Sequence, residues 1–318
     1  PGAALSVDGI EEVTAIELSP LVARAAGTYF GDFNHGILDS EAASIVIGDG
    51  RTFIASETES FDVVTGDLFL PWSPGTARLY STEHFASVRR ALKPGGVFCQ
   101  WLPMYQLTPE QFQLIADTFA SQFEDTHLFM NHFRVSSPMV ALIGGKEAGW
   151  LDWTKMGSRC EQVRNSDSVS DPVLRHEPGI RLLYLGPWQM NEARPNRLTL
   201  ADPSLEYSAS MTRLSGDPAK QYYDPTNWVK FCRARQQQYA SRSSASSSEQ
   251  ADLMLLATGL LELDYARRTG NELADAIAAR VSQEVPRCFA YDLLADMNRW
   301  PGQSILWQRG NSSAVGTK

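Results

Sequence analysis

The sequence has few cysteines, and neither its cysteines nor its histidines show paired spacing. The four cysteines, Cys99, Cys160, Cys232 and Cys288, lie far apart in a chain of 318 residues. This separation excludes the closely spaced ligand pairs that are typical of zinc sites, and a disulfide framework is not expected in a chain of this length. We therefore expect a reduced, cytoplasmic setting and no metal site.

Basic charge and long apolar runs are also scarce. The chain has 28 Lys and Arg against 37 Asp and Glu, a net charge of −9, which excludes the basic face that nucleic-acid binding requires. An acidic balance is compatible with a cationic ligand. No apolar run approaches the roughly 18 residues that cross a bilayer, and there is no signal peptide. The chain begins at Pro1 without a methionine, so we expect it to be a piece of a longer protein.

The first half of the sequence alternates short apolar runs with helical patterns. Residues 19–30 predict a helix with Ser19 as N-cap and Pro20 in its first turn. Residues 82–92 carry an apolar helical face, and "TPEQ" at 108–111 predicts a capping box before another helix. The runs that we predict as strands are 13–18, 43–49, 61–67, 96–102, 126–132 and 139–145. This alternation indicates an α/β fold with a mainly parallel sheet covered on both faces.

Three regions are expected along the chain. Residues 1–150 form the α/β domain, and residues 151–247 are mixed in pattern and end in a serine-rich linker at 241–248. Residues 248–318 form a helical C-terminal region with a disordered tail after Trp307. The apolar stripes of that region, which are typical of core-facing helices, are Leu253, Leu256, Leu260 and Leu263; Leu273, Ile277 and Val281; and Phe289, Leu293 and Met297.

Three acidic residues, Glu17, Asp49 and Asp67, stand at corresponding places at the ends of predicted strands. Because ligands bind beyond the carboxyl ends of the strands in open parallel sheets, we expect these carboxylates to share a binding site. A carboxylate in the place of Glu17 commonly accepts hydrogen bonds from ribose hydroxyls. The ordinary alternatives are a solvated carboxylate for Glu17, an Asp-Gly turn at Asp49 and a helix or turn cap for Asp67.

Six segments resemble, in order and spacing, the spermidine synthase (polyamine aminopropyltransferase) family. They are closest to its divergent bacterial spermidine synthase-like branch, some members of which are fused to membrane transporter segments. The segments are "VTAIELSPLV", "IVIGDGRTFI", "FDVVTGDLFLPW", "LYSTEHF", "LKPGGVFCQWL" and "LADPSLEY". The resemblance covers about residues 5–210. It implies the Rossmann-like fold of class I S-adenosylmethionine-dependent methyltransferases, with one antiparallel strand, here 139–145.

The resemblance implies a donor site. Glu17 matches the acidic residue that holds the ribose of the adenosyl donor, and Asp49, with Gly50, matches an aspartate that contacts the adenine amino group. The donor is then decarboxylated S-adenosylmethionine or S-adenosylmethionine itself, and no metal takes part.

The resemblance also implies an acceptor side. Asp67 matches the catalytic aspartate, Gln100 a glutamine that faces the amine substrate, and Tyr80 an aromatic position bordering the site; ordinary packing is the alternative for the last two. An amine with a pKa near 10 must lose a proton before it attacks the carbon beside the sulfonium, and a carboxylate can orient the ammonium and accept that proton. His84 is interpreted as a helix-surface or cap residue.

Two features depart from the family pattern. Leu70 stands where the family has a second aspartate, and the first strand and its glycine-rich loop are missing, which predicts weaker donor binding. Three functions therefore stay open: aminopropyl transfer to a di- or polyamine, S-adenosylmethionine-dependent transfer to another acceptor, and a non-catalytic scaffold of the same fold. A homodimer, and an upstream membrane segment in the full-length protein, are further expectations.

Overall fold

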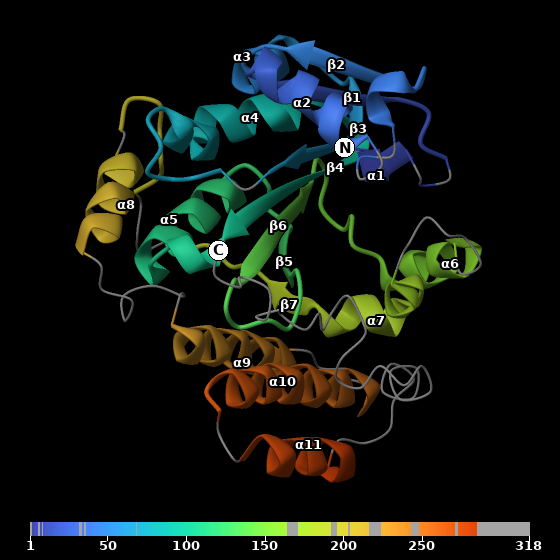
Figure 1. Ribbon diagram of the computed structural model, residues 1–318, viewed down its shortest axis with the longest axis vertical. Coiled ribbons are helices and arrows are strands. Elements are labelled where there is room, and N and C mark those ends of the chain that lie inside the picture. The colour runs from blue at the N-terminus through green and yellow to red at the C-terminus, as the bar shows by residue number, and fades with distance from the viewer. Residues whose placement is uncertain are drawn as a thin grey trace, which may run out of the picture.

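The computed structural model describes residues 2–5, 7, 9–31, 34, 36–67, 69–163, 171–191, 196–202, 204–215, 224–242, 248–270 and 273–284. Two β-sheets and the helices packed on them make up this part of the chain (Figure 1). No helix in these ranges has both the length and the apolar character that crossing a membrane requires.

The larger sheet has the strand order β3-β4-β6-β5-β7. β3 (Phe61–Gly66) and β4 (Leu92–Pro103) are parallel, whereas β6 (Met139–Gly145) runs antiparallel both to β4 and to β5 (Thr126–Met130). The predicted α/β fold and the predicted antiparallel strand at 139–145 are therefore confirmed. The larger sheet is mixed and not mainly parallel as predicted, because β6 runs antiparallel to both of its neighbours and β7 runs antiparallel to β5. An edge strand that the sequence did not predict, β7 (Tyr184–Pro187), pairs antiparallel with β5.

A second sheet contains two parallel strands, β1 (Val13–Glu17) and β2 (Ala43–Ile47). Within the described residues, β1 pairs only with β2 and β3 pairs only with β4, so each has one unpaired edge. The side chain of Val63 on β3 is 56% exposed, although strands of parallel sheets are normally covered on both faces. The parallel strands therefore form two separate pairs, β1 with β2 and β3 with β4.

Side-chain caps define the helices that cover the sheets. The Ser19 hydroxyl accepts a hydrogen bond from the Val22 N–H at the start of α2, and Thr108 and Gln111 form the predicted capping box of α5. The sequence did not predict α3, which begins directly after Asp49. The bounds are α1 Gly2–Leu5, α2 Pro20–Phe30, α3 Gly50–Ser56, α4 Thr82–Ala91 and α5 Pro109–Ala120, with short 3-10 helices η1 Ile37–Asp39, η2 Thr76–Tyr80, η3 Met104–Gln106 and η4 Pro172–Arg175.

The core of the larger sheet lies where α4 and α5 pack on β4. Phe85 from α4, Phe98 from β4 and Phe119 from α5 are at most 1% exposed. Their ring centroids are 5.2–6.1 Å apart. Burying each ring contributes roughly 2–3 kcal/mol, so this aromatic layer fixes β4 and, through it, the ends of the strands where the predicted site lies.

Helix α9 packs on the far edge of the same sheet. α9 contacts β7, and Figure 1 shows α9, α10 and α11 stacked below it. The division into three regions stays a prediction, although β7 joins the sheet of the first region. Most of the linker at 241–248, the stripe of Phe289, Leu293 and Met297, and the tail lie outside the described residues. The bounds are α6 Trp153–Val163, α7 Glu177–Leu182, α8 Ser204–Ser215, α9 Pro225–Arg242, α10 Ser248–Arg268 and α11 Leu273–Glu284.

Candidate active site

The three acidic residues follow the carboxyl ends of parallel strands. Glu17 is the last residue of β1, Asp49 comes two residues after β2, and Asp67 comes directly after β3. Glu17 and Asp49 are brought together by the pairing of β1 with β2, since the Gly48 N–H donates to the Glu17 carbonyl over 3.0 Å.

The carboxylate of Glu17 lies against the start of α2. Its Oε1 accepts a hydrogen bond of 2.8 Å from the Ser19 N–H. A carboxylate in this place stabilises the positive end of the helix dipole. One carboxylate oxygen therefore has a local structural role. The other has no hydrogen-bond partner among the described residues.

The carboxylate of Asp49 caps α3. Its Oδ1 accepts hydrogen bonds from the Arg51 N–H at 2.8 Å and the Thr52 N–H at 3.4 Å, and its Oδ2 lies 3.9 Å from the Arg51 guanidinium. Gly50 is the first residue of α3, and a Cβ there would meet only Ile16 at 3.8 Å. The capping role alone is enough to explain an aspartate at this position. Because the Asp49 side chain is exposed, it can also contact a ligand.

Asp67 is exposed, and its backbone carbonyl is held by a hydrogen bond from the neighbouring strand β4. Gln100 on β4 donates from Nε2 to the Asp67 carbonyl over 3.0 Å and to the Trp101 carbonyl over 3.0 Å. The register of the sheet causes this contact, because Gly66 pairs directly with Gln100. The next fixed point is the Phe69 carbonyl, which accepts a hydrogen bond of 2.8 Å from the Tyr80 hydroxyl.

Gln100 is fully buried, and its second polar atom, Oε1, has no hydrogen-bond partner among the described residues. Oε1 lies under Gly66, where an added Cβ would approach it to 2.3 Å. A buried carbonyl oxygen without a donor is costly, so a ligand N–H or a water molecule is its expected partner. Of the six predicted site residues, Gln100 therefore has the clearest unmet hydrogen-bonding capacity.

Tyr80 supports the loop and does not titrate near neutral pH. Its ring is fully buried, and burial holds the pKa of its phenol well above the ordinary value, with the negative charge of Asp67 acting in the same direction. The hydroxyl is used on the Phe69 carbonyl. Tyr80 thus acts on the site through the backbone that follows Asp67.

The structure buries His84, so its interpretation as a helix-surface or cap residue is wrong. Its side chain is buried, and Nδ1 has no hydrogen-bond partner. Its pKa is lowered to about 4, mainly by burial and also by the nearby Arg51 guanidinium, while Asp49 opposes the shift. His84 therefore lies within electrostatic reach of the start of α3, while Tyr80 of the same connection lies within reach of Asp67.

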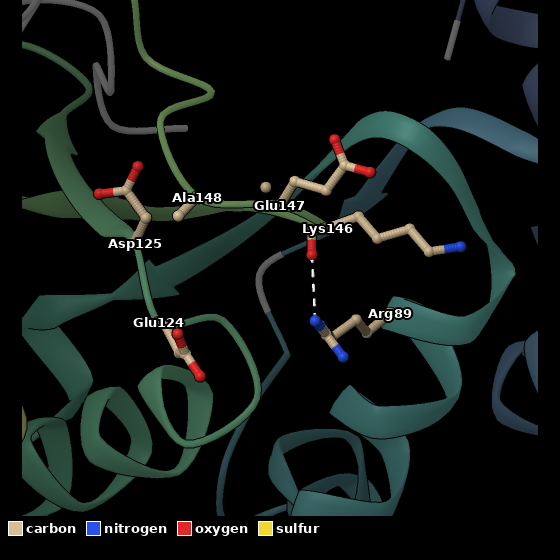
Figure 2. A pocket seen from close by; sticks show the side chains of 7 residues that line it. Arg89, Glu124, Asp125, Lys146, Glu147 and Ala148 are labelled. Carbon is tan, nitrogen blue, oxygen red and sulfur yellow. Dashed lines mark hydrogen bonds between the residues drawn. The ribbon is translucent and has the colours of Figure 1, made fainter.

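The cavity in Figure 2 lies elsewhere. It has a volume of about 260 Å³ and mixes both charges, and the Arg89 guanidinium on its wall donates to the Lys146 carbonyl over 3.1 Å. The Lys146 N–H in turn donates to the Gly96 carbonyl near the beginning of β4, at the opposite end from Gln100. None of the six predicted site residues lines this cavity, whose walls are Arg89, Glu124, Asp125, Gly145, Lys146, Glu147 and Ala148. Among the described residues, no cluster of His, Cys, Asp and Glu has the arrangement of a metal site.

Comparisons with known proteins match the region that holds these residues. Residues 5–137 match the family model described as spermine/spermidine synthase domain. A polyamine aminopropyltransferase of Mycobacterium tuberculosis (strain H37Rv) is 38% identical over 116 residues, which are 36% of this chain and 22% of that protein. One of Aeropyrum pernix is 32% identical over 117 residues, 36% of this chain and 37% of that protein. A crystal structure of spermidine synthase from Thermotoga maritima is similar with a TM-score of 0.41 at 24% identity, covering 48% of this chain and 52% of that one. The matched part is thus well under half of either curated relative.

Proposed function

We propose that this chain is the catalytic part of an aminopropyltransferase, because residues 5–137 match the spermine/spermidine synthase family model. The donor is decarboxylated S-adenosylmethionine, and the acceptor is a small di- or polyamine. The observation that carries the proposal is the placement of Asp67. It is an exposed carboxylate at the end of a parallel strand, and buried Gln100 holds its backbone from beneath.

The reaction is an in-line displacement at carbon. The acceptor nitrogen, once deprotonated, forms a bond to the propyl carbon next to the sulfonium, the carbon–sulfur bond breaks, and methylthioadenosine leaves with that electron pair. Asp67 attracts the ammonium, orients it and accepts the proton that the nitrogen loses. Most of the rate gain in such a step comes from holding the two reactants in line.

The donor lies along Glu17 and Asp49 in this proposal. Glu17 accepts hydrogen bonds from the ribose hydroxyls, and Asp49, beside Gly50, accepts one from the adenine amino group. The open edges of β1 and β3 support the view that a further strand and its glycine-rich loop complete the donor site.

Binding and turnover test the proposal separately. Calorimetry with S-adenosylmethionine, its decarboxylated form and methylthioadenosine establishes whether an adenosyl sulfonium binds, and a panel of amines with mass detection establishes transfer. The proposal expects binding of the decarboxylated donor and an aminopropylated product. Binding of the carboxylated donor alone would contradict it in favour of another transfer reaction, and no binding of any of the three would leave only a scaffold.

A further inference from the structure

Helix α8 is in contact with the loop that follows Asp67. Three of its side chains reach residues 69–80, which we call the Asp67 loop. The Arg213 guanidinium lies over the Trp72 ring, 4.4 Å from its centroid. Glu206 Oε2 accepts a hydrogen bond of 2.9 Å from the Gly75 N–H, and the Ser210 hydroxyl is 3.5 Å from the Trp72 carbonyl.

These three side chains share one face of α8. Residues 206, 210 and 213 are spaced by four and three positions, which places them one above another along a helix. The Arg–Trp contact is a cation–π interaction, and the Glu206 contact is a charge-assisted hydrogen bond to the backbone. Gly75 itself adopts a left-handed backbone (φ 80°) just before η2, so Glu206 holds the loop at its sharpest bend.

A neighbouring face of α8 is anchored to the core. Leu205 and Ala209 are at most 2% exposed. The buried side chain of Gln111 donates to the Thr212 hydroxyl over 3.1 Å and to the Ser208 hydroxyl over 3.5 Å. Gln111 is itself held by the capping box of α5. A rigid helix start is thereby linked through α8 to the Asp67 loop.

The Asp67 loop has few other attachments. Tyr80 holds the Phe69 carbonyl, and the backbone hydrogen bonds of the described residues beyond it are local, among them Ser73 N–H to Leu70 and Thr76 N–H to Ser73, both 3.0 Å. Phe69 also packs on the core, and Pro71 is buried. Leu70 is 42% exposed. Among the described residues, the hydrogen bonds that reach residues 70–75 from outside the loop therefore come from α8.

We propose that α8 positions the Asp67 loop, with Arg213 and Glu206 as positioning residues that hold Trp72 and Gly75. This inference rests on the proposed function for its catalytic meaning. The loop forms the wall beside Asp67, so its displacement misaligns the acceptor amine with the donor carbon. In-line transfer is sensitive to displacements of about 1 Å, whereas the donor contacts at Glu17 and Asp49 lie on other strands.

Matched variants of the full chain separate the two faces of α8. Arg213→Ala and Glu206→Ala remove the contacts with the loop. Arg213→Lys keeps a cation over Trp72, and Glu206→Gln keeps a carbonyl oxygen for the Gly75 N–H. Met211→Ala is the control, because Met211 lies on the same helix but is 66% exposed.

Hydrogen exchange measured by mass spectrometry tests the contact without any substrate. We expect peptides from residues 69–80 to exchange about fivefold faster in the two alanine variants, and at the parental rate in Arg213→Lys, Glu206→Gln and Met211→Ala. Peptides from α4 and β4 report whether the fold is intact and should not change. Unaltered exchange of the loop in both alanine variants would overturn the proposal.

Kinetics test the positioning role. In the alanine variants we expect kcat to fall about tenfold while the dissociation constant of the donor stays within about twofold, with recovery in the two conservative variants. Faster exchange with unchanged kcat and acceptor KM would refute the positioning role. If the parent transfers no aminopropyl group at all, the proposed function fails, and hydrogen exchange still decides whether α8 holds the loop.

Discussion

The side-chain amide of Gln100 donates a 3.0 Å hydrogen bond to the backbone carbonyl of Asp67, from a position where Gln100 is fully buried and Asp67 is exposed. One residue belongs to the packed centre of the sheet and the other to its rim. The bond therefore fixes the backbone of Asp67 to the packed core. The carboxylate on which the proposed chemistry depends is carried by that backbone.

Removing that amide should weaken both the fold and the site. Gln100→Met keeps much of the side-chain volume but leaves the carbonyls of Asp67 and Trp101 without this donor. We expect the free energy of unfolding to fall by about 2 kcal/mol and turnover to fall with it, as measured by urea denaturation and product formation. Gln122→Met is the control, because among the described residues the Gln122 amide donates a hydrogen bond only to the neighbouring Ser121 hydroxyl. Equal losses in the two variants would contradict this role of Gln100.

The space above Gln100 should tolerate no methyl group. In Gly66→Ala the new Cβ would lie 2.3 Å from Oε1 and 3.1 Å from Nε2 of Gln100, so the amide must move. We expect a loss of about 1–3 kcal/mol in unfolding free energy, whereas Gly48→Ala, where a Cβ meets nothing within 4 Å, should be near neutral. The double variant with Gln100→Met should lose less than the sum of the two single losses, since both act on one contact. Full additivity would show that they act independently.

Glu17→Ala should weaken donor binding by about tenfold, as the loss of a charge-assisted hydrogen bond implies. Glu17 also accepts from the Ser19 N–H, so a loss of helix stability must be separated from a loss of ligand contact. Glu17→Gln serves this purpose, because it keeps an oxygen acceptor without the charge. Calorimetry with the decarboxylated donor measures the effect, and parental affinity in Glu17→Ala would rule out the ribose role.

Protonation of His84 should destabilise the protein in mild acid. Burial lowers its pKa to about 4 in the folded state, below the ordinary value of about 6.5, so the unfolded chain binds the proton more tightly. Neutral His84 makes its full contribution to the free energy of unfolding above pH 6.5, and this contribution is lost as the pH falls toward 4. The loss is on the order of 2 kcal/mol between pH 7 and pH 5.

His84→Leu checks this prediction, because the His84 ring has an unpartnered Nδ1 and leucine leaves no buried polar atom in its place. We expect the variant to lose less unfolding free energy than the parent between pH 7 and pH 5. Part of the dependence should persist, since burial also lowers the pKa of His132 to about 4. Identical pH dependence in variant and parent would mean that His84 titrates normally.

The sequence predicted the elements whose signals are local. The capping residues Ser19 and Thr108 marked two helix starts correctly, and the run 139–145 was correctly assigned as a strand. The antiparallel direction of that strand came from the family resemblance. It missed β7, because the four residues Tyr184–Pro187 have no alternating pattern and become a strand only by pairing with β5. It missed α3, because Asp-Gly is both a turn dipeptide and a helix start.

The positions of the three acidic residues at strand ends could be predicted from the sequence, whereas the contacts around them could not. Positions at strand ends singled out Glu17, Asp49 and Asp67. The support that Gln100 gives to Asp67 depends on the register of β3 against β4, and the burial of His84 depends on how α4 packs against α3. The link between α8 and Trp72 joins residues about 140 positions apart, and no local pattern in the sequence encodes it.

The most direct measurement is the effect of Asp67→Asn on donor binding and on aminopropyl transfer in the same preparation. The account predicts that transfer to the amine falls by at least about a hundredfold, because asparagine cannot accept the proton, while the decarboxylated donor binds with nearly parental affinity. Undiminished transfer by Asp67→Asn would contradict the central claim that this carboxylate activates the amine.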